Sequence, residues 1–459
     1  MMHKIYLSLL LTSFTYAQTV NFEQALNFTF KNNKDLKKQK LDIEVANLNI
    51  EKVNSISYGK LSFEEQINRT NHAGYVFNSK LSSREASFND FGAGQYTGLP
   101  SSLNIQADNL NNPEDRNNFN TKLNYDIPLF TGFKLSNQKE ILKLQKKANE
   151  VKYNLDKRQL SYEVLKAYNQ AVLAKEFIKT TKKAKESIAF IVKSANAFYK
   201  EGLVTKIDVK QAQVHELNIN TKNLESENKF QLALAYLKFL TSKNEINDVE
   251  KLKYIKIKYS NFNVLYENAL KNADELRMQD INIKAKKKNI EISKAEYYPT
   301  VYSHLEYGFN DDKLTLDSKK DYYNAVLGLK YTIFDNTRDV DMQKSQIQYK
   351  KSLFDYEKLK DAIKLQLQKA LLDLEIKEKI LKEREETLIL ANDIYKQSQL
   401  MYKNHLIAMT DLLQQEANLR NTKTQLIAAK YEKSLSLAKI NLISGNSFLS
   451  NNTILKVIK

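Results

Sequence analysis

The sequence of 459 residues contains no cysteine and no tryptophan, and it has only 10 glycines and 4 prolines. The lack of cysteine excludes a disulfide framework and an acyl anchor on an N-terminal cysteine. No later segment has 18 consecutive apolar residues, which excludes a bundle of transmembrane helices. Because glycine and proline are so scarce and 27% of the residues are charged, the composition is that of long helices or coiled coils.

The formal net charge is +17. The lysines are spread along helical stretches, as on solvated helix faces, and are not gathered beside base-reading groups, so no nucleic-acid partner is predicted. The five histidines are scattered without the spacing of metal ligands. The sequence shows no nucleophile–base pair, phosphate-binding loop or paired carboxylates. We therefore expect no metal, no cofactor and no enzymatic activity.

The N-terminus has the pattern of a secretory signal peptide. Lys4 precedes an apolar run from Ile5 to Phe14, and Thr15 and Ala17 place small residues at the −3 and −1 positions of a cleavage site. The apolar run is too short to span a membrane as a helix. We expect residues 1–17 to be removed and the mature chain to be exported.

The sequence repeats itself once. The stretch "YDIPLFTG" recurs as "YTIFDN", in which Phe130 is matched by Phe334 at an offset of 204 residues. Further along, "FYKEGLVTKIDV" is matched by "MYKNHLIAMTDL", in which Tyr199 lies over Tyr402 at an offset of 203. A near-constant offset over such a distance indicates two copies of one structural unit.

Each copy is expected to contain a helix, two strands, a very long helix and a second long helix. The expected organisation is a first structural repeat at 18–245, a linker or equatorial region at 246–265, a second repeat at 266–445 and a C-terminal tail at 446–459. The expected helices run from Phe22 to about Ser55, from about Thr131 to Gly202 and on to about Leu240, from Tyr266 to about Tyr297, and from about Asn336 to Asn404-His405 and on to about Leu442.

Four segments alternate with period two, apolar on one side and polar on the other: Lys60–Asn68, Asn118–Ile127, Val301–Phe309 and Tyr323–Ile333. The first of them is the least regular, because Glu65 stands on its apolar side. Each has about the length of a tilted strand that crosses a bilayer. A half-buried soluble sheet gives the same alternation, but the repeat and the signal peptide favour the membrane. Four strands cannot close a pore, so we expect a barrel built from several chains. Residues 70–117 and 310–320 are expected to be solvent-facing loops on the outer side.

The first long helix carries a coiled-coil seam that Arg158 interrupts. With about 70 residues it would extend roughly 105 Å, several times the thickness of a bilayer. Such a helix is suited to bridging a periplasm. The seam residues are Ile141, Leu144, Ala148, Val151, Leu155, Tyr162 and Leu165.

Together these features resemble the TolC-like outer-membrane efflux family. The matching motifs are "YDIPLFTG" and "YTIFDN" at strand-to-helix junctions, "KAEYYPT" at a helix-to-strand junction, and "GLVTKID" and "HLIAMTD" between paired helices. The resemblance implies a mainly α fold with membrane β-strands. Three chains, each giving four strands, would form a 12-stranded outer-membrane barrel that continues as a periplasmic α-helical coiled-coil barrel.

The resemblance also implies a function and partners. The protein would be the passive outer-membrane duct of a tripartite efflux or type I secretion system in a Gram-negative cell, exporting drugs, other small molecules or proteins. A homotrimer, a periplasmic adaptor (membrane fusion protein) and an inner-membrane pump of the resistance-nodulation-division or ABC type would be involved. The alternatives are a periplasmic coiled-coil scaffold and a trimeric surface adhesin or stalk, which would carry its strands only at the C-terminus.

By resemblance, the turns between the paired helices close the tunnel, and Tyr402 bonds Asp208 in the closed state. Asp208 and Asp411 are alternatively helix caps. The family often has glycine at the position of His405, a basic residue at Ile407 and an acidic ring at Gln414. The expected gate residues are Tyr199, Asp208, Tyr402, Asp411 and Gln414. The expected adaptor contacts are Gly202, Leu203, Val204, Thr205, His405, Leu406 and Ile407.

Overall fold

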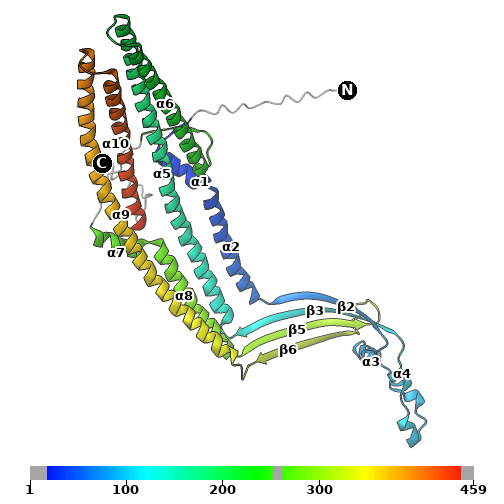
Figure 1. Cartoon of the computed structure of the whole chain (residues 1–459). Coiled ribbons are helices and arrows are strands. Elements are labelled where there is room, and N and C mark those ends of the chain that lie inside the picture. Colours follow the sequence, from blue (N-terminus) through cyan, green and yellow to red (C-terminus); the bar gives the residue numbers. More distant parts are fainter. Residues whose placement is uncertain (1–17, 252–260, 446–459) are drawn as a thin grey trace, which may run out of the picture. The chain divides into compact units, whose positions relative to one another are not determined.

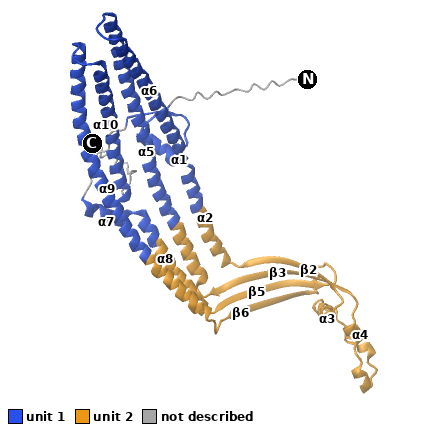
Figure 2. Cartoon of the chain, in the orientation of Figure 1, with its two compact units in different colours: residues 1–43, 148–280, 354–459 blue, residues 44–147, 281–353 orange. Residues whose placement is uncertain are grey.

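The structure is a computed structural model that describes residues 18–251 and 261–445. The expected signal peptide, part of the expected linker and the expected C-terminal tail lie outside the described residues. The chain divides into two compact units (Figure 2). Of the described residues, 18–43, 148–251, 261–280 and 354–445 form one unit, and 44–147 and 281–353 form the other.

Both halves of the chain have the same order of elements, as the sequence repeat predicts (Figure 1). The helices α5 and α9 each have 67 residues, which corresponds to roughly 100 Å. The first half contains α1 (Phe22–Asn32), α2 (Lys34–Ile56), β2 (Lys60–Thr70), β3 (Arg116–Thr131), α5 (Lys134–Lys200) and α6 (Lys206–Thr241). The second half contains α7 (Phe262–Asn272), α8 (Asp274–Lys294), β5 (Thr300–Asp311), β6 (Asp321–Lys330), α9 (Thr337–Lys403) and α10 (Met409–Ile443).

The first helix of each half is broken, where the sequence predicted one continuous helix. At Asn33 the side-chain oxygen accepts hydrogen bonds from the N–H groups of Asp35 and Leu36 at 3.0 and 3.2 Å, which caps α2. The Asn33 amide also donates to the carbonyl of Leu240 at 3.2 Å. In the second half the break falls at Ala273.

Other boundaries also differ from the predictions. β6 ends at Lys330, so residues 331–333 lie outside it. The predicted loop between β2 and β3 contains the short helices α3 (Ala73–Ser82) and α4 (Asp108–Asn111) and three 3₁₀ turns. A loop was predicted here because the segment is rich in turn-forming residues. In the structure, local hydrogen bonds form short helices within it.

The four longer strands form an antiparallel sheet in the order β2-β3-β5-β6. Its register separates the two faces, as the period-two pattern predicts. Phe63 lies opposite Leu123, Leu123 opposite Tyr307, and Tyr307 opposite Tyr323. These four side chains are 44% to 83% exposed. A contiguous exposed apolar face of this kind marks a surface that contacts something other than water.

The opposite face of the sheet is charged. The Lys122 ammonium lies 3.6 Å from the carboxylate of Glu64 and 3.8 Å from that of Glu306. On the same face His304 Nδ1 lies 2.7 Å from Asp126 Oδ1. Because side chains alternate along each strand, most of the charged groups share this face. The exceptions are Glu65, whose carboxylate accepts a hydrogen bond from the Thr121 hydroxyl, and Asp321 at the start of β6, which both lie on the apolar face.

A short parallel strand pair, β1 (Gln18–Val20) and β4 (Ile246–Val249), was not predicted, because three or four residues are too few to show a period. Tyr168 on α5 is buried against it. The Tyr168 hydroxyl lies 3.0 Å from the carbonyl oxygen of Val20 and 2.8 Å from that of Glu250. This contact fixes β1 and β4 on α5.

Arg158 interrupts the predicted seam because it forms a buried ion pair. Its guanidinium binds the carboxylate of Asp274, the first residue of α8, and donates to the carbonyl of Gly445 at 2.7 Å. The Arg158 and Asp274 side chains are 12% and 4% exposed. Within residues 18–251 and 261–445, no helix is both long enough and apolar enough to cross a membrane.

Candidate functional site

The turn between α5 and α6 is a Schellman motif. Gly202 has a φ of +72°, its N–H donates to the Tyr199 carbonyl at 3.1 Å, and the Leu203 N–H donates to the Phe198 carbonyl at 2.9 Å. No atom lies within 4 Å of where a Cβ on Gly202 would stand. Glycine is therefore favoured here by its backbone angle and not by a lack of space.

The turn between α9 and α10 has the same geometry without glycine. His405 has a φ of +58°, its N–H donates to the Tyr402 carbonyl at 3.0 Å, and the Leu406 N–H donates to the Met401 carbonyl at 2.8 Å. A left-handed non-glycine residue costs roughly 1 kcal/mol. The His405 ring packs edge-on against Phe198 with centroids 5.0 Å apart, which offsets part of that cost. We call residues 198–208 and 401–411 the tip turns.

The two helices that follow the tip turns are capped differently. Thr205 is the N-cap of α6, its N–H donates to Asp208 Oδ2 at 2.8 Å, and the Asp208 N–H donates to Thr205 Oγ1 at 3.3 Å. This reciprocal pair is a capping box. Ala408 at the start of α10 has no side chain that could cap. Asp411 therefore contributes only its charge in the first turn of α10, where the helix dipole favours it.

The caps give a pair of opposite predictions. Thr205→Ala should destabilise the start of α6 by about 1 kcal/mol, and Ala408→Thr should stabilise the start of α10 by a similar amount. Hydrogen exchange of the first-turn amides measures both: exchange should become faster in the first variant and slower in the second. Unchanged exchange in both variants would show that the caps do not control these helix ends.

Tyr402 has a buried ring, 7% exposed, whose centroid lies 6.0 Å from that of Phe198. Its hydroxyl has no hydrogen-bond partner within the described parts of the chain. Burial raises the pKa of the Tyr402 hydroxyl, and the charge of Asp208 raises it further. The hydroxyl therefore keeps its proton and remains a hydrogen-bond donor. The bond to Asp208 that the resemblance implies for a closed state is not formed here, and it stays a prediction for that state.

The remaining predicted residues lie around the tip turns. Leu203 and Leu406 are 55% and 68% exposed, whereas Val204 and Ile407 are half-buried. Tyr199, the repeat counterpart of Tyr402, is 45% exposed. Gln414 is exposed and donates to Asn418 at 3.1 Å. The structure thus brings Tyr402 near Asp208, and it leaves Tyr199 and Gln414 on the surface.

A hydrophobic core from α5, α6, α9 and α10 supports both tip turns. Ile188, Ile219 and Leu413 are almost completely buried in it. The hydroxyls of Tyr395 on α9 and Ser187 on α5 lie 2.7 Å apart. The two helix pairs are therefore joined by apolar packing and by this hydrogen bond, within one unit of the chain.

The sequence did not reveal a buried ion pair on α10. Glu416 is 4% exposed, and its carboxylate lies 3.2 Å from the guanidinium of Arg420. Burial raises the pKa of the Glu416 carboxyl, and the charge of Arg420 acts against this. An acid and a base four residues apart are the usual pattern of a solvated helix face, so this pair gave no signal in the sequence.

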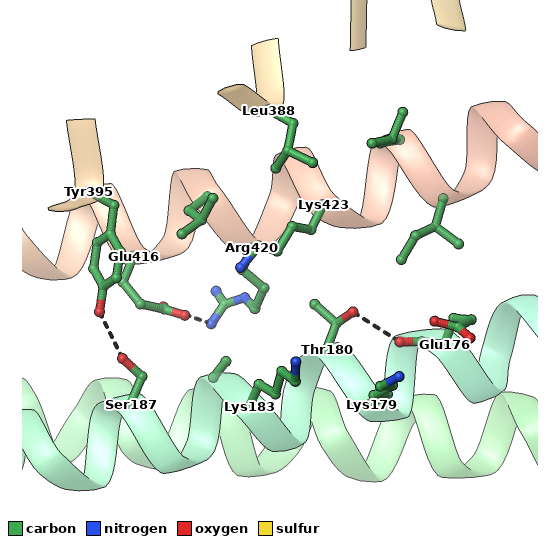
Figure 3. Close-up of a pocket in the computed structure, with 14 residues that line it drawn as sticks. Glu176, Lys179, Thr180, Lys183, Ser187, Leu388, Tyr395, Glu416, Arg420 and Lys423 are labelled. Carbon is green, nitrogen blue, oxygen red and sulfur yellow. Dashed lines mark hydrogen bonds and ion pairs between the residues drawn. The ribbon is translucent and has the colours of Figure 1, made fainter. Parts of the chain in front are cut away.

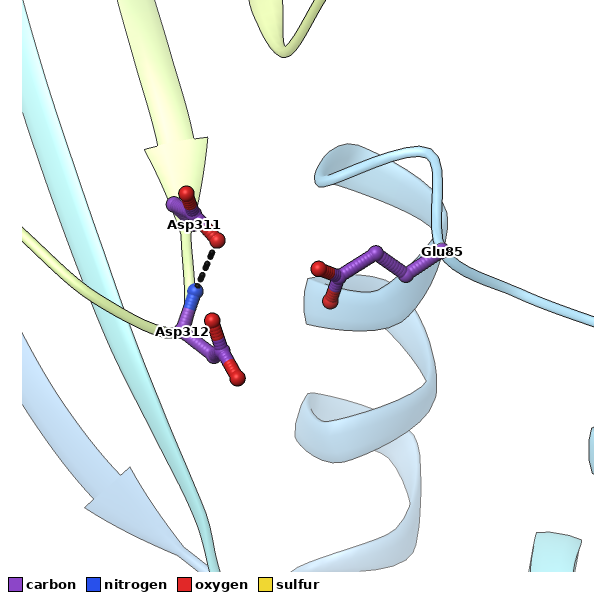
Figure 4. A group of neighbouring side chains, drawn as sticks. All are labelled: Glu85, Asp311 and Asp312. Atoms are coloured by element: carbon purple, nitrogen blue, oxygen red, sulfur yellow. Dashed lines mark hydrogen bonds between the residues drawn. The ribbon is translucent and has the colours of Figure 1, made fainter. Parts of the chain in front are cut away.

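Three carboxylates, those of Glu85, Asp311 and Asp312, lie within 4.8 Å of one another at one end of the sheet (Figure 4). Cationic side chains already balance two of them. The Lys320 ammonium lies 2.5 Å from Glu85 and 2.6 Å from Asp311, and Arg116 also binds Glu85. We interpret this group as an ion-pair network that ties the β2–β3 segment to the β5–β6 turn.

A family model for the outer membrane efflux protein matches residues 26–242 and 265–446. No curated protein sequence matches the chain. Solved structures with the same fold include CusC, at a TM-score of 0.76 and 14% identity over 93% of this chain and 92% of that one. The Campylobacter jejuni CmeC outer membrane channel has a TM-score of 0.74 and 17% identity, over 95% of this chain and 88% of that one. The open Neisseria gonorrhoeae MtrE outer membrane channel has a TM-score of 0.72 and 13% identity, over 93% of this chain and 89% of that one.

Proposed function

The chain belongs to the outer membrane efflux protein family, and we propose that it forms the outer-membrane channel of a tripartite efflux or type I secretion system. The family consists of passive channels, and the proposal assigns no catalytic residue, cofactor or metal. The structural likeness to CmeC and MtrE, both described as outer membrane channels, supports the fold on which the proposal depends.

The observation that carries the proposal is the four-stranded sheet. One face exposes Phe63, Leu123, Tyr307 and Tyr323, and the other carries charged pairs such as that of Lys122 with Glu64. This is the arrangement of a membrane barrel with lipid outside and water inside. The edge strands β2 and β6 run in opposite directions, because the order is β2-β3-β5-β6 and every pair is antiparallel. The β2 strand of one chain can therefore pair antiparallel with the β6 strand of the next identical chain. Three chains joined in this way would give twelve strands.

In the proposal, the two repeats at 18–245 and 266–445 each supply two strands and one pair of long helices. The long helices continue the barrel as a periplasmic tunnel, and the tip turns form its gate. The exposed Leu203 and Leu406 at the tip turns are contacts for a periplasmic adaptor, which links the channel to an inner-membrane pump. Three chains would present six tip turns at that end.

Fractionation tests the location. We expect the full chain to remain in the outer-membrane pellet after washing with alkaline carbonate, because its apolar sheet face is in lipid. A soluble periplasmic marker protein in the same cells should be released by osmotic shock. If the full-length chain is released with that marker, the protein is a periplasmic scaffold and the channel proposal is wrong.

A further inference from the structure

A cavity of about 330 Å³ lies between α5, α9 and α10 (Figure 3). It lies within one chain and one compact unit. Its wall is rich in cationic side chains, with four bases against two acids. The bases are Lys179 and Lys183 on α5 and Arg420 and Lys423 on α10, and the acids are Glu176 and Glu416. The lining therefore carries a net charge of two positive units.

The charges in this wall are of two kinds. Arg420 pairs with the buried Glu416 at 3.2 Å, so these two charges balance each other. Lys179, Lys183 and Lys423 form no ion pair within 4 Å and no hydrogen bond among the residues that the structure describes, although Lys423 is close enough to Glu416 for its charge to act on that carboxyl. Three ammonium groups without a direct ion pair thus line one cavity, and Glu176 is the only other acid in its lining. Cationic side chains that line one cavity make its electrostatic potential positive, which favours an anion as the ligand.

The rest of the wall is apolar. Leu388 comes from α9, and Leu419, Leu426 and Ile427 come from α10. The Tyr395–Ser187 hydrogen bond crosses from α9 to α5 beside the cavity. The volume is at the lower end of the range for ligand pockets, about 300–1,000 Å³. An apolar wall with a few convergent charged groups is also the usual composition of such a pocket.

We propose that this cavity binds a small organic anion, with a sulfonate, carboxylate or phosphate group among Lys179, Lys183 and Lys423 and an apolar body against Leu388 and its neighbours. A solvated lysine-rich helix face would require neither the apolar wall nor the convergence of the lysines from two helices. The proposal goes beyond the channel function, because the site is complete within one chain.

Isothermal titration of the purified full chain with 2-naphthalenesulfonate tests the site. We expect one saturable site per chain that weakens as salt is added, because the attraction is electrostatic. The double variant Lys179→Gln/Lys183→Gln should raise the dissociation constant about tenfold or more. The matched control is Lys182→Gln/Lys185→Gln, which removes two exposed lysines of α5 outside the cavity lining.

Any one of three results would rule out the proposed binding site. They are the absence of saturable binding, equal affinity in the two double variants, and equal binding of the uncharged 2-naphthol. Circular dichroism of each variant should match that of the parent chain. If a variant fails this check, Lys423→Gln on α10 replaces it, and the dissociation constant should again rise about tenfold.

Discussion

Replacing Arg158 by alanine is expected to lower the free energy of unfolding by about 3–5 kcal/mol. The substitution leaves the carboxylate of Asp274, which is 4% exposed, without its principal buried partner. It also removes the donor to the Gly445 carbonyl, so α5 loses its polar contacts with the first residue of α8 and with the turn that follows α10. Urea unfolding followed by circular dichroism measures the loss.

Arg277 provides the matched control, because it lies 3.6 Å from the same carboxylate but is 55% exposed. Arg277→Ala should cost less than about 1 kcal/mol. The double variant Arg158→Met/Asp274→Leu should recover most of the lost stability, since apolar side chains remove the buried charge altogether. If Arg158→Ala and Arg277→Ala had equal effects, the buried pair would not be the link that the structure indicates.

Tyr402→Phe is expected to raise the open probability of the channel in planar bilayers about tenfold or more. A hydrogen bond to a charged group such as Asp208 would stabilise the closed state by about 1.5–3 kcal/mol, and phenylalanine cannot form it. In the arrangement described here the hydroxyl has no hydrogen-bond partner, so the substitution breaks no hydrogen bond in this arrangement.

The repeat supplies the control for Tyr402. Tyr199→Phe makes the same chemical change at the equivalent position of the other tip turn, where the side chain is exposed, and it should leave the conductance unchanged. Asp208→Asn should act like Tyr402→Phe, because the amide is a weaker acceptor for the Tyr402 hydroxyl, while its oxygen can still accept from the Thr205 N–H in the capping box. Equal conductance of Tyr402→Phe and the parent, in correctly assembled channels, would remove the gate role of this tyrosine.

Local signals in the sequence were enough for most of the fold. The alternation of apolar and polar residues predicted the four strands, and the constant offset between similar motifs predicted the repeat. Gly202 indicated one tip turn. The other tip turn, at His405, has no glycine and was recognisable only through the repeat. The breaks at Asn33 and Ala273 were missed, because neither residue breaks a helix by itself. At Asn33 the break accompanies a side-chain bond to Leu240, which is 207 residues away.

The candidate site was less predictable than the fold. Thr205 and Asp208 have the spacing of a capping box, so that pair could have been found from the sequence. The pairing of Arg158 with Asp274, and the meeting of α5 lysines with Lys423, depend on which helices pack together. Lysines that line the cavity and lysines that face solvent have the same local sequence pattern, so periodicity cannot separate them.

If three chains close one barrel, the sheet of each chain is one third of a ring, and disulfide crosslinking tests this directly. The chain has no cysteine, so every bond formed would be between introduced residues. Gln66→Cys on β2 is combined in turn with Asn324→Cys or Val326→Cys on β6, all on the charged face. At the register that brings the Cα atoms within about 4.4–6.8 Å, the account predicts dimers and trimers and nothing larger, with none in the single-cysteine variants. Monomers at every register, or a ladder that extends beyond three chains, would contradict it.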